Sequence, residues 1–247
     1  MAACSGSLPK PGTLPCVIVR EKPDSFVLVE QHEHALVSGE FARRWVEGPS
    51  PLGPTLYAVE NHDVAWRGPD REVLWNEEAG RPYSFLDYPL GPKLSAQRRG
   101  IDLVEAHDAY AACLCSMHYS RFLLASENPA EVEFREWEEG RQRRLRGGIA
   151  EGDLGNLERN FRFLRLCDGL SLFLFLYEPG RTGYPPPTPG GFELDGTRYE
   201  LSWQNGRSVR LEPFPLTGPF EVAVPHREVG KDRQPLREGV LEFRVFG

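Results

Sequence analysis

Histidine and aspartate residues form the pattern in this chain of 247 residues that points most directly to chemistry. His34, the doublet His62–Asp63 and Asp168 each lie on or near the apolar side of a segment with helical periodicity. Burying an unpaired charge is costly, so a carboxylate inside an apolar stripe, such as that of Asp168, requires a cation, a network of donors or a metal ion. Two imidazoles and two carboxylates suit one divalent transition metal ion of intermediate hardness, namely Fe, Mn, Zn, Co or Ni.

Such an ion would keep coordination positions for water and substrate, and it would acidify the bound water into a nucleophile at neutral pH. His118 follows Ala111 and Leu114 on one helical face, so it is expected to face the same interior and to act as a general acid or a phosphate ligand. His107 is left out, because an unbroken helix would separate it from His118 by roughly 16 Å. One ion is therefore expected, although Asp63 could bridge a second.

Each of these residues also has an explanation without a metal ion. A buried histidine is most often a hydrogen-bonded core residue, and Asp168 could pair with Arg165 one helical turn before it. The chain would then be a non-catalytic binding or regulatory protein that works through its terminal strands. The metal hypothesis draws its weight from the set, because three separate segments each offer ligand-type residues on an apolar stripe.

The elements that must position these residues follow from changes in hydrophobic period. Two β-rich runs at 16–20 and 25–30 predict a β-hairpin. A helix is predicted over 31–46, where Val37, Phe41 and Trp45 recur four residues apart. An apolar segment at 56–66 and helical segments at 93–124, 130–147 and 152–177 follow, and then alternating runs predict strands at 192–194, 199–203, 208–211, 220–224 and 241–246.

These elements predict a mainly α fold, a helical core with a small β-sheet built from the N-terminal hairpin and the C-terminal strands, and hence α+β overall. Residues 1–15 are expected to be a disordered lead-in, because they contain Gly, Ser and Pro without periodicity. The helical core with its hairpin would span 16–180. After a segment rich in Pro and Gly at 179–191, a β-rich region over 181–247 would pack on that core.

Composition excludes several classes of protein. The formal net charge of -7 argues against general binding to nucleic acid or to anionic membranes, which need a basic surface. The longest apolar run, 170–177, is far too short to cross a bilayer, and residues 1–12 lack the apolar segment of a signal peptide. Five cysteines without a CxxC pair argue against a disulfide framework and a cysteine zinc site, so a cytoplasmic location is expected.

The order H…HD…D from His34 to Asp168 resembles the HD-domain superfamily of metal-dependent phosphohydrolases. By position, His34 resembles the first ligand, His62–Asp63 the central doublet and Asp168 the final carboxylate, on an HD-like helical core. Many members carry a Gly-Lys pair shortly after the doublet. Here 64–67 is Val-Ala-Trp-Arg, so Arg67 is the candidate for the positive charge that this lysine supplies.

The longer sequence is similar to a bacterial family of unknown function, the domain-of-unknown-function 3891 family. The segments that carry this resemblance are 31–42 (QHEHALVSGEFA), 58–66 (AVENHDVAW), 80–89 (GRPYSFLDYP), 108–118 (DAYAACLCSMH), 163–172 (FLRLCDGLSL) and 211–220 (LEPFPLTGPF). The resemblance covers nearly the whole chain from about residue 16. It implies membership of a family that has no established activity.

The first functional hypothesis is hydrolysis of an unidentified phosphoester by a metal-bound hydroxide, with His118 and Arg67 as catalytic residues. The partner would be a small phosphorylated molecule bound by cations, for which Arg81, Lys93 and Arg165 are further candidates; the oligomeric state stays open. The second hypothesis is an iron-dependent oxygenase of the HD-like type, which would need two irons and extra histidine ligands. The third is the non-catalytic protein described above.

Overall fold

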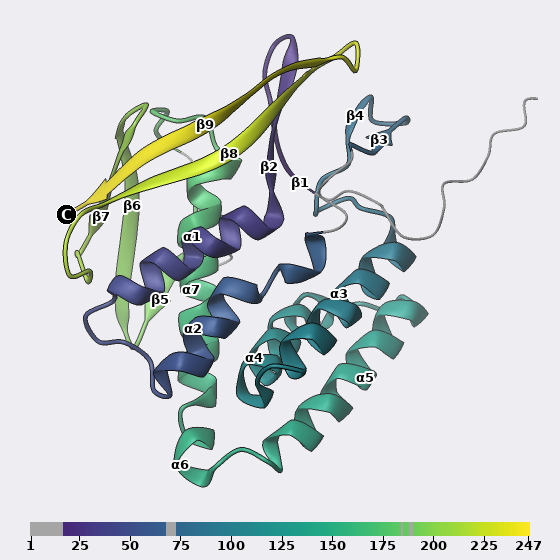
Figure 1. Ribbon diagram of the computed structural model, residues 1–247, viewed down its shortest axis with the longest axis vertical. Coiled ribbons are helices and arrows are strands. Elements are labelled where there is room, and N and C mark those ends of the chain that lie inside the picture. Colours follow the sequence, from purple (N-terminus) through teal and green to yellow (C-terminus); the bar gives the residue numbers. More distant parts are fainter. Residues whose placement is uncertain (1–16, 68–72, 184, 188–189) are drawn as a thin grey trace, which may run out of the picture.

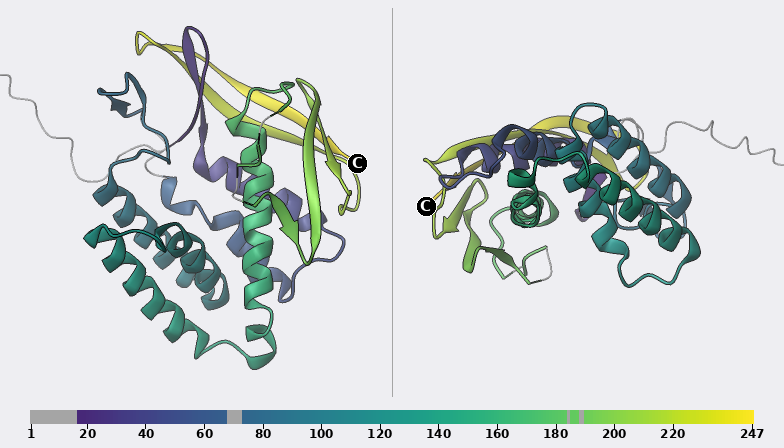
Figure 2. Two further views of the ribbon diagram at one scale, coloured as in Figure 1. Left: turned by 180° about the vertical axis from the view of Figure 1, so that it is seen from behind. Right: turned by 90° about the horizontal axis from the view of Figure 1, so that it is seen from below.

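The computed structural model describes residues 17–67, 73–183, 185–187 and 190–247 of the chain. A curled seven-stranded sheet covers one end of a group of helices, and helices α1 (Gln31–Arg44) and α7 (Leu157–Leu176) lie against its inner side (Figure 1). Figure 2 shows α7 end-on within the curl of the sheet. The segment 1–15, expected to be a disordered lead-in, lies outside the described residues.

The sheet joins strands from both ends of the chain. Its order is β1-β2-β8-β9-β7-β6-β5, and every neighbouring pair is antiparallel except the parallel pair β7–β9. The bounds are β1 Val17–Glu21, β2 Ser25–Glu30, β5 Phe192–Leu194, β6 Thr197–Asn205, β7 Ser208–Glu212, β8 Phe220–Gly230 and β9 Pro235–Phe246. The N-terminal hairpin is continuous with the C-terminal strands because β2 pairs with β8.

The size of this sheet corrects the predicted fold class. The expectation of a mainly α, HD-like core with a small sheet is wrong, because the chain is an α+β protein with a large curled sheet. The underestimate arose at β8 and β9, which run well beyond the alternating segments 220–224 and 241–246. The added residues 235–240 of β9 are almost all exposed, and residues 225–230 of β8 change from exposed at Pro225 to three consecutive buried residues at 228–230. Neither run shows the alternation of apolar and polar residues that predicts a strand.

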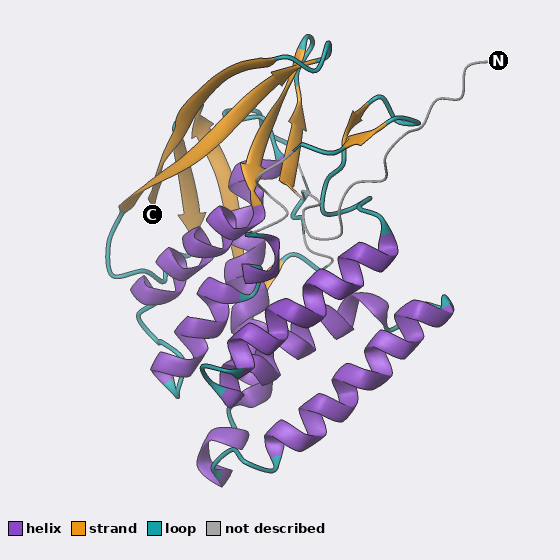
Figure 3. Cartoon of the chain, turned by 45° about the vertical axis from the view of Figure 1, so that its right-hand side comes forward, coloured by secondary structure: helices purple, strands orange, loops and turns teal. Residues whose placement is uncertain are grey.

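The helices away from the sheet form a second group, and Figure 3 shows strands and helices separated on two sides of the molecule. Their bounds are α2 Leu52–Asn61, α3 Leu90–Glu105, α4 Ala109–Ser120, α5 Pro129–Arg146 and the short α6 Glu151–Leu154, with 3-10 turns η1 Val64–Trp66 and η3 Arg121–Leu123 and a two-stranded ribbon of β3 Trp75–Asn76 and β4 Arg81–Pro82. The Asp108 side chain caps α4 by accepting a hydrogen bond from the Ala111 N–H at 2.8 Å.

Aromatic side chains pack α1 and α7 against the sheet and against each other. Phe41 of α1 contacts Phe220 of β8 edge to face, with ring centroids 5.2 Å apart. Trp45 contacts Phe163 of α7 and Tyr199 of β6 in the same manner. The predicted stripe of Val37, Phe41 and Trp45 is buried as a consequence, and this burial fixes which side of α1 faces the interior.

One glycine allows a close approach that matters for the histidine–aspartate doublet. Gly100 of α3 packs against Ala65 of η1, and a Cβ atom at Gly100 would lie 2.5 Å from the Ala65 Cβ. Since any side chain there would push η1 away, the glycine lets α3 hold the turn that directly follows Asp63. Among the described residues, no helix is both long and apolar enough to span a membrane.

A buried carboxylate links the hairpin to the long ribbon of the sheet. Glu228 of β8 accepts hydrogen bonds from the Ser25 hydroxyl at 2.6 Å, from Arg237 at 2.7 Å and from Lys22 at 3.2 Å. The Ser25 hydrogen bond is the largest cause that lowers the pKa of Glu228, and with Arg237 and Lys22 it brings that pKa to about 2 against the opposing effect of burial. Because the folded pKa is depressed, the stabilisation is present above the ordinary value of 4.5 and is lost as the pH falls toward 2.

We therefore expect Glu228→Gln to lower the free energy of unfolding by about 1–3 kcal/mol at pH 7, after allowance for the exposed partners. The difference from the unchanged protein should shrink between pH 4.5 and pH 2, as urea unfolding at several pH values would measure. Glu221→Gln serves as the matched control, because Glu221 lies exposed on the same strand, 3.8 Å from Arg244. A difference that does not vary with pH would contradict this assignment.

Candidate metal centre

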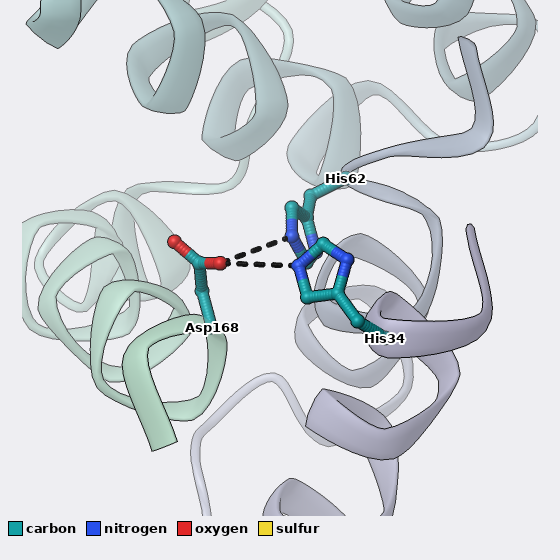
Figure 4. A group of neighbouring side chains, drawn as sticks. All are labelled: His34, His62 and Asp168. Carbon is teal, nitrogen blue, oxygen red and sulfur yellow. Dashed lines mark hydrogen bonds and ion pairs between the residues drawn. The ribbon is translucent and has the colours of Figure 1, made fainter. Parts of the chain in front are cut away.

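Three side chains from three helical segments converge in the interior. His34 lies in the first turn of α1, His62 follows the last residue of α2, and Asp168 lies in the middle of α7. Figure 4 shows the carboxylate of Asp168 directed at both imidazoles. One donor atom of each residue lies within 4.8 Å of the others, and all three side chains are buried, so this group could hold a metal ion.

Backbone carbonyl groups orient both imidazoles. The Nδ1 of His34 lies 2.5 Å from the Gln31 carbonyl oxygen, and the Nδ1 of His62 lies 2.8 Å from the Val59 carbonyl oxygen. A carbonyl only accepts hydrogen bonds, so each Nδ1 carries a hydrogen and donates it. In a neutral ring the lone pair is then on Nε2, which is how metal-binding histidines are commonly held.

The Nε2 atoms face a shared carboxylate oxygen at distances that suit ligands of one ion. Asp168 Oδ1 lies 3.3 Å from the Nε2 of His34 and 3.5 Å from the Nε2 of His62. Two donors each about 2.1 Å from an ion are about 3.0–3.4 Å apart in octahedral or tetrahedral geometry. Both distances to Asp168 therefore suit ligands of one transition metal ion.

The electrostatics of the group call for a cation. Burial opposes charge on His62, but Asp63 and Asp168 outweigh burial and raise the pKa of His62 to about 9. Burial likewise favours the neutral acid of Asp168, whereas the hydrogen bonds from His34 and His62 keep its pKa well below the ordinary range. A positive charge is thus held between these groups, and a divalent ion would supply it in place of protons.

Asp63 adds a second carboxylate beside the first. Its Oδ2 lies 3.7 Å from the Nε2 of His34 and 3.8 Å from the Nε2 of His62, and its Oδ1 accepts a hydrogen bond from the Tyr119 hydroxyl at 2.8 Å. Tyr119 therefore fixes the rotation of the carboxylate and keeps Oδ2 directed at both imidazoles. All four residues of the expected ligand set lie together, with Asp63 slightly farther from the two imidazoles than Asp168.

A pair of hydroxyl groups ties the two helices that carry His34 and Asp168. Ser38, one turn after His34, and Ser171, one turn after Asp168, lie within hydrogen-bonding distance with oxygen atoms 2.8 Å apart. Both residues are fully buried. This contact fixes the separation of α1 and α7 at the level of the metal-binding group.

His118 lies at the same centre but is held in a different manner. Its Nε2 lies 3.9 Å from Asp168 Oδ2, and its Nδ1 lies 2.8 Å from Nη1 of Arg121. A guanidinium only donates hydrogen bonds, so Nδ1 accepts and the neutral ring carries its hydrogen on Nε2. Burial, followed by the charge of Arg121, lowers the pKa of His118 well below its ordinary value. His118 is thus a neutral donor directed at the centre.

Arg121, like Tyr119, is a residue of the site that sequence analysis missed. Besides its bond to His118, it donates a hydrogen bond from Nη2 to Asp168 Oδ2 at 3.3 Å. Its position three residues after His118 is the signal that could have found it, because residues at that spacing share one side of a helix. Asp168 therefore pairs with Arg121, whereas sequence analysis considered Arg165 as its partner.

The other expected cations lie differently. Arg67 follows η1 and is exposed, and it does not line the cavity beside the metal-binding group. Arg81 pairs with Asp87 at 2.9 Å. Lys93 lines the cavity and donates a hydrogen bond to the Phe85 carbonyl oxygen at 2.9 Å. Arg121 and Lys93, and not Arg67, are thus the side chains that place a positive charge beside the centre.

A cavity of ≈ 160 Å³ gives access to the centre. His34, Asp63, His118 and Asp168 line its inner end, so a ligand in the cavity would contact both the metal-binding group and the donor of His118. His107, left out of the expected site, lies away from it and stacks on Tyr57 with ring centroids 4.0 Å apart.

The fold and the centre together define an α+β protein with a buried group of two histidines and a carboxylate beneath a curled sheet. A family model described as "Protein of unknown function (DUF3891)" matches residues 17–231, and the chain belongs to this family. That match names no activity, and it gives no support to the resemblance to the HD-domain superfamily. No curated protein matches the chain, and no solved structure matches it either.

We expect the protein to bind about one equivalent of a divalent transition metal ion, and Asp168→Asn to abolish this binding because Oδ1 is shared by both imidazoles. Elemental analysis of both proteins after incubation with metal ions and desalting would measure it. Since an ion that binds only the folded state stabilises it, a chelator should lower the melting temperature of the unchanged protein but not that of Asp168→Asn. His107→Ala, a histidine outside the centre, should retain the ion; equal metal content in all three proteins would contradict the site.

Proposed function

We propose that this chain is a metal-dependent hydrolase of phosphoesters. The observation that carries the proposal is the opposite orientation of neighbouring imidazoles. His34 and His62 direct to a common point the Nε2 atoms that a metal ion would bind in place of hydrogen, whereas Arg121 holds His118 with a hydrogen on Nε2. Two metal ligands and one hydrogen-bond donor on a single cavity match the requirements of metal-assisted hydrolysis.

The balance of charge favours an anionic substrate. Asp63 and Asp168 contribute two negative charges, which a divalent ion would neutralise, and Arg121 adds a positive charge. The loaded centre would therefore be positive overall, in a buried environment where charges interact strongly. A phosphate group bound at the inner end of the cavity would compensate that charge.

An ion of Fe, Mn, Zn, Co or Ni held by His34, His62, Asp63 and Asp168 would supply acidified water and would polarise the phosphate oxygens. In the overall reaction the oxygen of water forms a bond to phosphorus, and the bond from phosphorus to the ester oxygen breaks. The water proton is taken up as the leaving oxygen becomes an alcohol. The products are one alcohol and inorganic phosphate, so no oxidant or other co-reactant is required.

His118 and Arg121 would serve the leaving group and the phosphate. The Nε2–H of His118 is positioned to donate a hydrogen bond to the leaving oxygen or to a phosphate oxygen. A neutral imidazole keeps this hydrogen, so the proton of the leaving alcohol would come from the attacking water. Arg121 fixes the orientation of that ring and also contacts Asp168, so it couples the donor to the ligand set. Arg121 is thus a positioning residue for His118.

We expect His118→Phe to lower kcat for a metal-dependent phosphoester hydrolysis by roughly 10²-fold, because a phenyl ring cannot donate a hydrogen bond to the charge that develops on the phosphate and the leaving oxygen. Phosphate release from a panel of monoesters, with and without added metal ion, would measure the effect. Metal content should stay at the level of the unchanged protein, which separates loss of a hydrogen-bond donor from loss of the ion. His107→Phe is the control; absence of phosphate release by the loaded protein from every ester would refute the proposal.

One observation favours a second candidate, an iron-dependent oxygenase. Two histidines and one carboxylate with open coordination positions are the usual ligand set of non-haem Fe(II) oxygenases, and His34, His62 and Asp168 form such a set. The apolar walls of the cavity are compatible with oxidation of a carbon atom. The charge of Arg121 ranks this candidate second, since a neutral substrate would not compensate it.

The two candidates differ in how they respond to iron and oxygen. For the hydrolase, we expect phosphate release by the Fe(II)-loaded protein to be the same with and without oxygen, because water is the only co-substrate. Oxygen consumption measured with an electrode should not exceed that of Asp168→Asn. Oxygen uptake that requires Fe(II) and Asp168, without phosphate release, would favour the oxygenase.

A further inference from the structure

The cavity beside the metal-binding group has two chemically different ends. Its inner end is polar and consists of the ligand set, His118 and the Tyr119 hydroxyl. Its remaining walls are mainly apolar and are formed by Trp66, Leu90, Leu94, Phe122, Leu123 and Leu172. These walls come from η1, α3, η3 and α7, and two of these elements, η3 and α7, also carry Arg121 and Asp168 of the centre.

The size of the cavity limits what can occupy it. Its volume of ≈ 160 Å³ is similar to that of apolar cavities of about 150 Å³ that bind one benzene molecule. Since this volume includes the polar inner end, a phosphate group with one six-membered ring or a short alkyl chain is the most that the cavity would enclose. A nucleoside, with a base and a sugar, would exceed it.

The two charged groups on the outer walls have opposite signs. The Lys93 ammonium donates a hydrogen bond to the Phe85 carbonyl oxygen, and Glu131 places a carboxylate on the wall. That carboxylate offsets the charge of Lys93 and would repel a second phosphate group. A single negative charge at the inner end is therefore better accommodated than a polyphosphate chain.

We infer that the site takes a monophosphate ester whose organic group is apolar and no larger than about one ring. This inference rests on the proposed hydrolase function and adds the class of substrate. The phosphate lies at the inner end, against the ligand set and His118, and the organic group lies between α3 and η3. Hydrolysis then yields a small apolar alcohol and inorganic phosphate.

Phosphonates test the inference without catalysis, because their bond between carbon and phosphorus is not hydrolysed. We expect the protein loaded with one equivalent of Zn²⁺ to bind phenylphosphonate at least tenfold more tightly than methylphosphonate, as measured by isothermal titration calorimetry. Adenosine monophosphate should bind no more tightly than methylphosphonate. Equal affinity for the two phosphonates, or a preference for the nucleotide, would overturn the inference.

Two wall residues allow the apolar contact to be tested by substitution. Leu86 also lines the cavity yet is 71% exposed, so Leu86→Ser should leave the fold intact. We expect it to weaken phenylphosphonate binding at least threefold and to leave methylphosphonate binding unchanged. Leu124→Ser is the matched control, because Leu124 is 68% exposed and does not line the cavity.

A substitution that fills part of the cavity tests the same contact independently. Leu90→Phe adds a ring at the start of α3 and should weaken phenylphosphonate binding at least tenfold, with methylphosphonate binding and melting temperature unchanged. Loss of both phosphonates together in Leu90→Phe and Leu86→Ser would overturn the inference, because the outer walls would then not contact the organic group selectively.

Hydrolysis of phenyl phosphate separates the inference from the proposed function. A preference for phenylphosphonate with no phosphate released from phenyl phosphate would support the ligand class while refuting the hydrolase. Metal-dependent phosphate release without any preference among the phosphonates would support the hydrolase and overturn the ligand class. The two ideas can therefore fail separately.

Discussion

The buried carboxylate of Asp168 is the constraint on which the arrangement of the helices depends. An unpaired charge at this depth would cost several kcal/mol, and the fold meets that cost by bringing His34, His62, His118 and Arg121 around one side chain. These partners come from α1, α2, α4 and η3, whereas Asp168 lies on α7. Asp168 can therefore be buried only because four helical segments pack against α7. The hydrogen-bonding contact between the Ser38 and Ser171 hydroxyls fixes the distance between α1 and α7.

The sheet positions the centre in two ways, through the covalent link from β2 to α1 and through packing against α1. Strand β2 ends at Glu30 and α1 begins at the next residue, so the register of β2 against β8 determines where His34 lies. The other side of α1 is fixed by Phe41 against Phe220 of the same strand β8. A curled sheet that holds both α1 and α7 gives the two helices a common support. The large sheet therefore helps to keep the centre rigid, although none of its strands supplies a candidate metal ligand.

The sequence predicted those residues of the site that differ in polarity from their neighbours in the chain. A carboxylate or an imidazole within an apolar stripe stands out in the sequence, and His34, His62, Asp63 and Asp168 were found in this way and lie together. Arg121 was missed because an arginine at the end of a helix is usually exposed, and only the turn of η3 directs it inward. The sheet was underestimated because β8 and β9 pair through backbone groups beyond their alternating segments, over residues whose burial shows no regular period.

The charge balance of the centre connects its parts and limits its chemistry. With a divalent ion, the two carboxylates and Arg121, the inner end of the cavity is positive and the apolar walls raise the cost of leaving that charge without a partner. A neutral ligand would not meet that cost, whereas an anionic group would meet it and would lie beside the Nε2–H of His118. The same apolar walls make a large polar body unfavourable. Only a ligand that is anionic at one end and apolar at the other therefore suits both halves of the cavity.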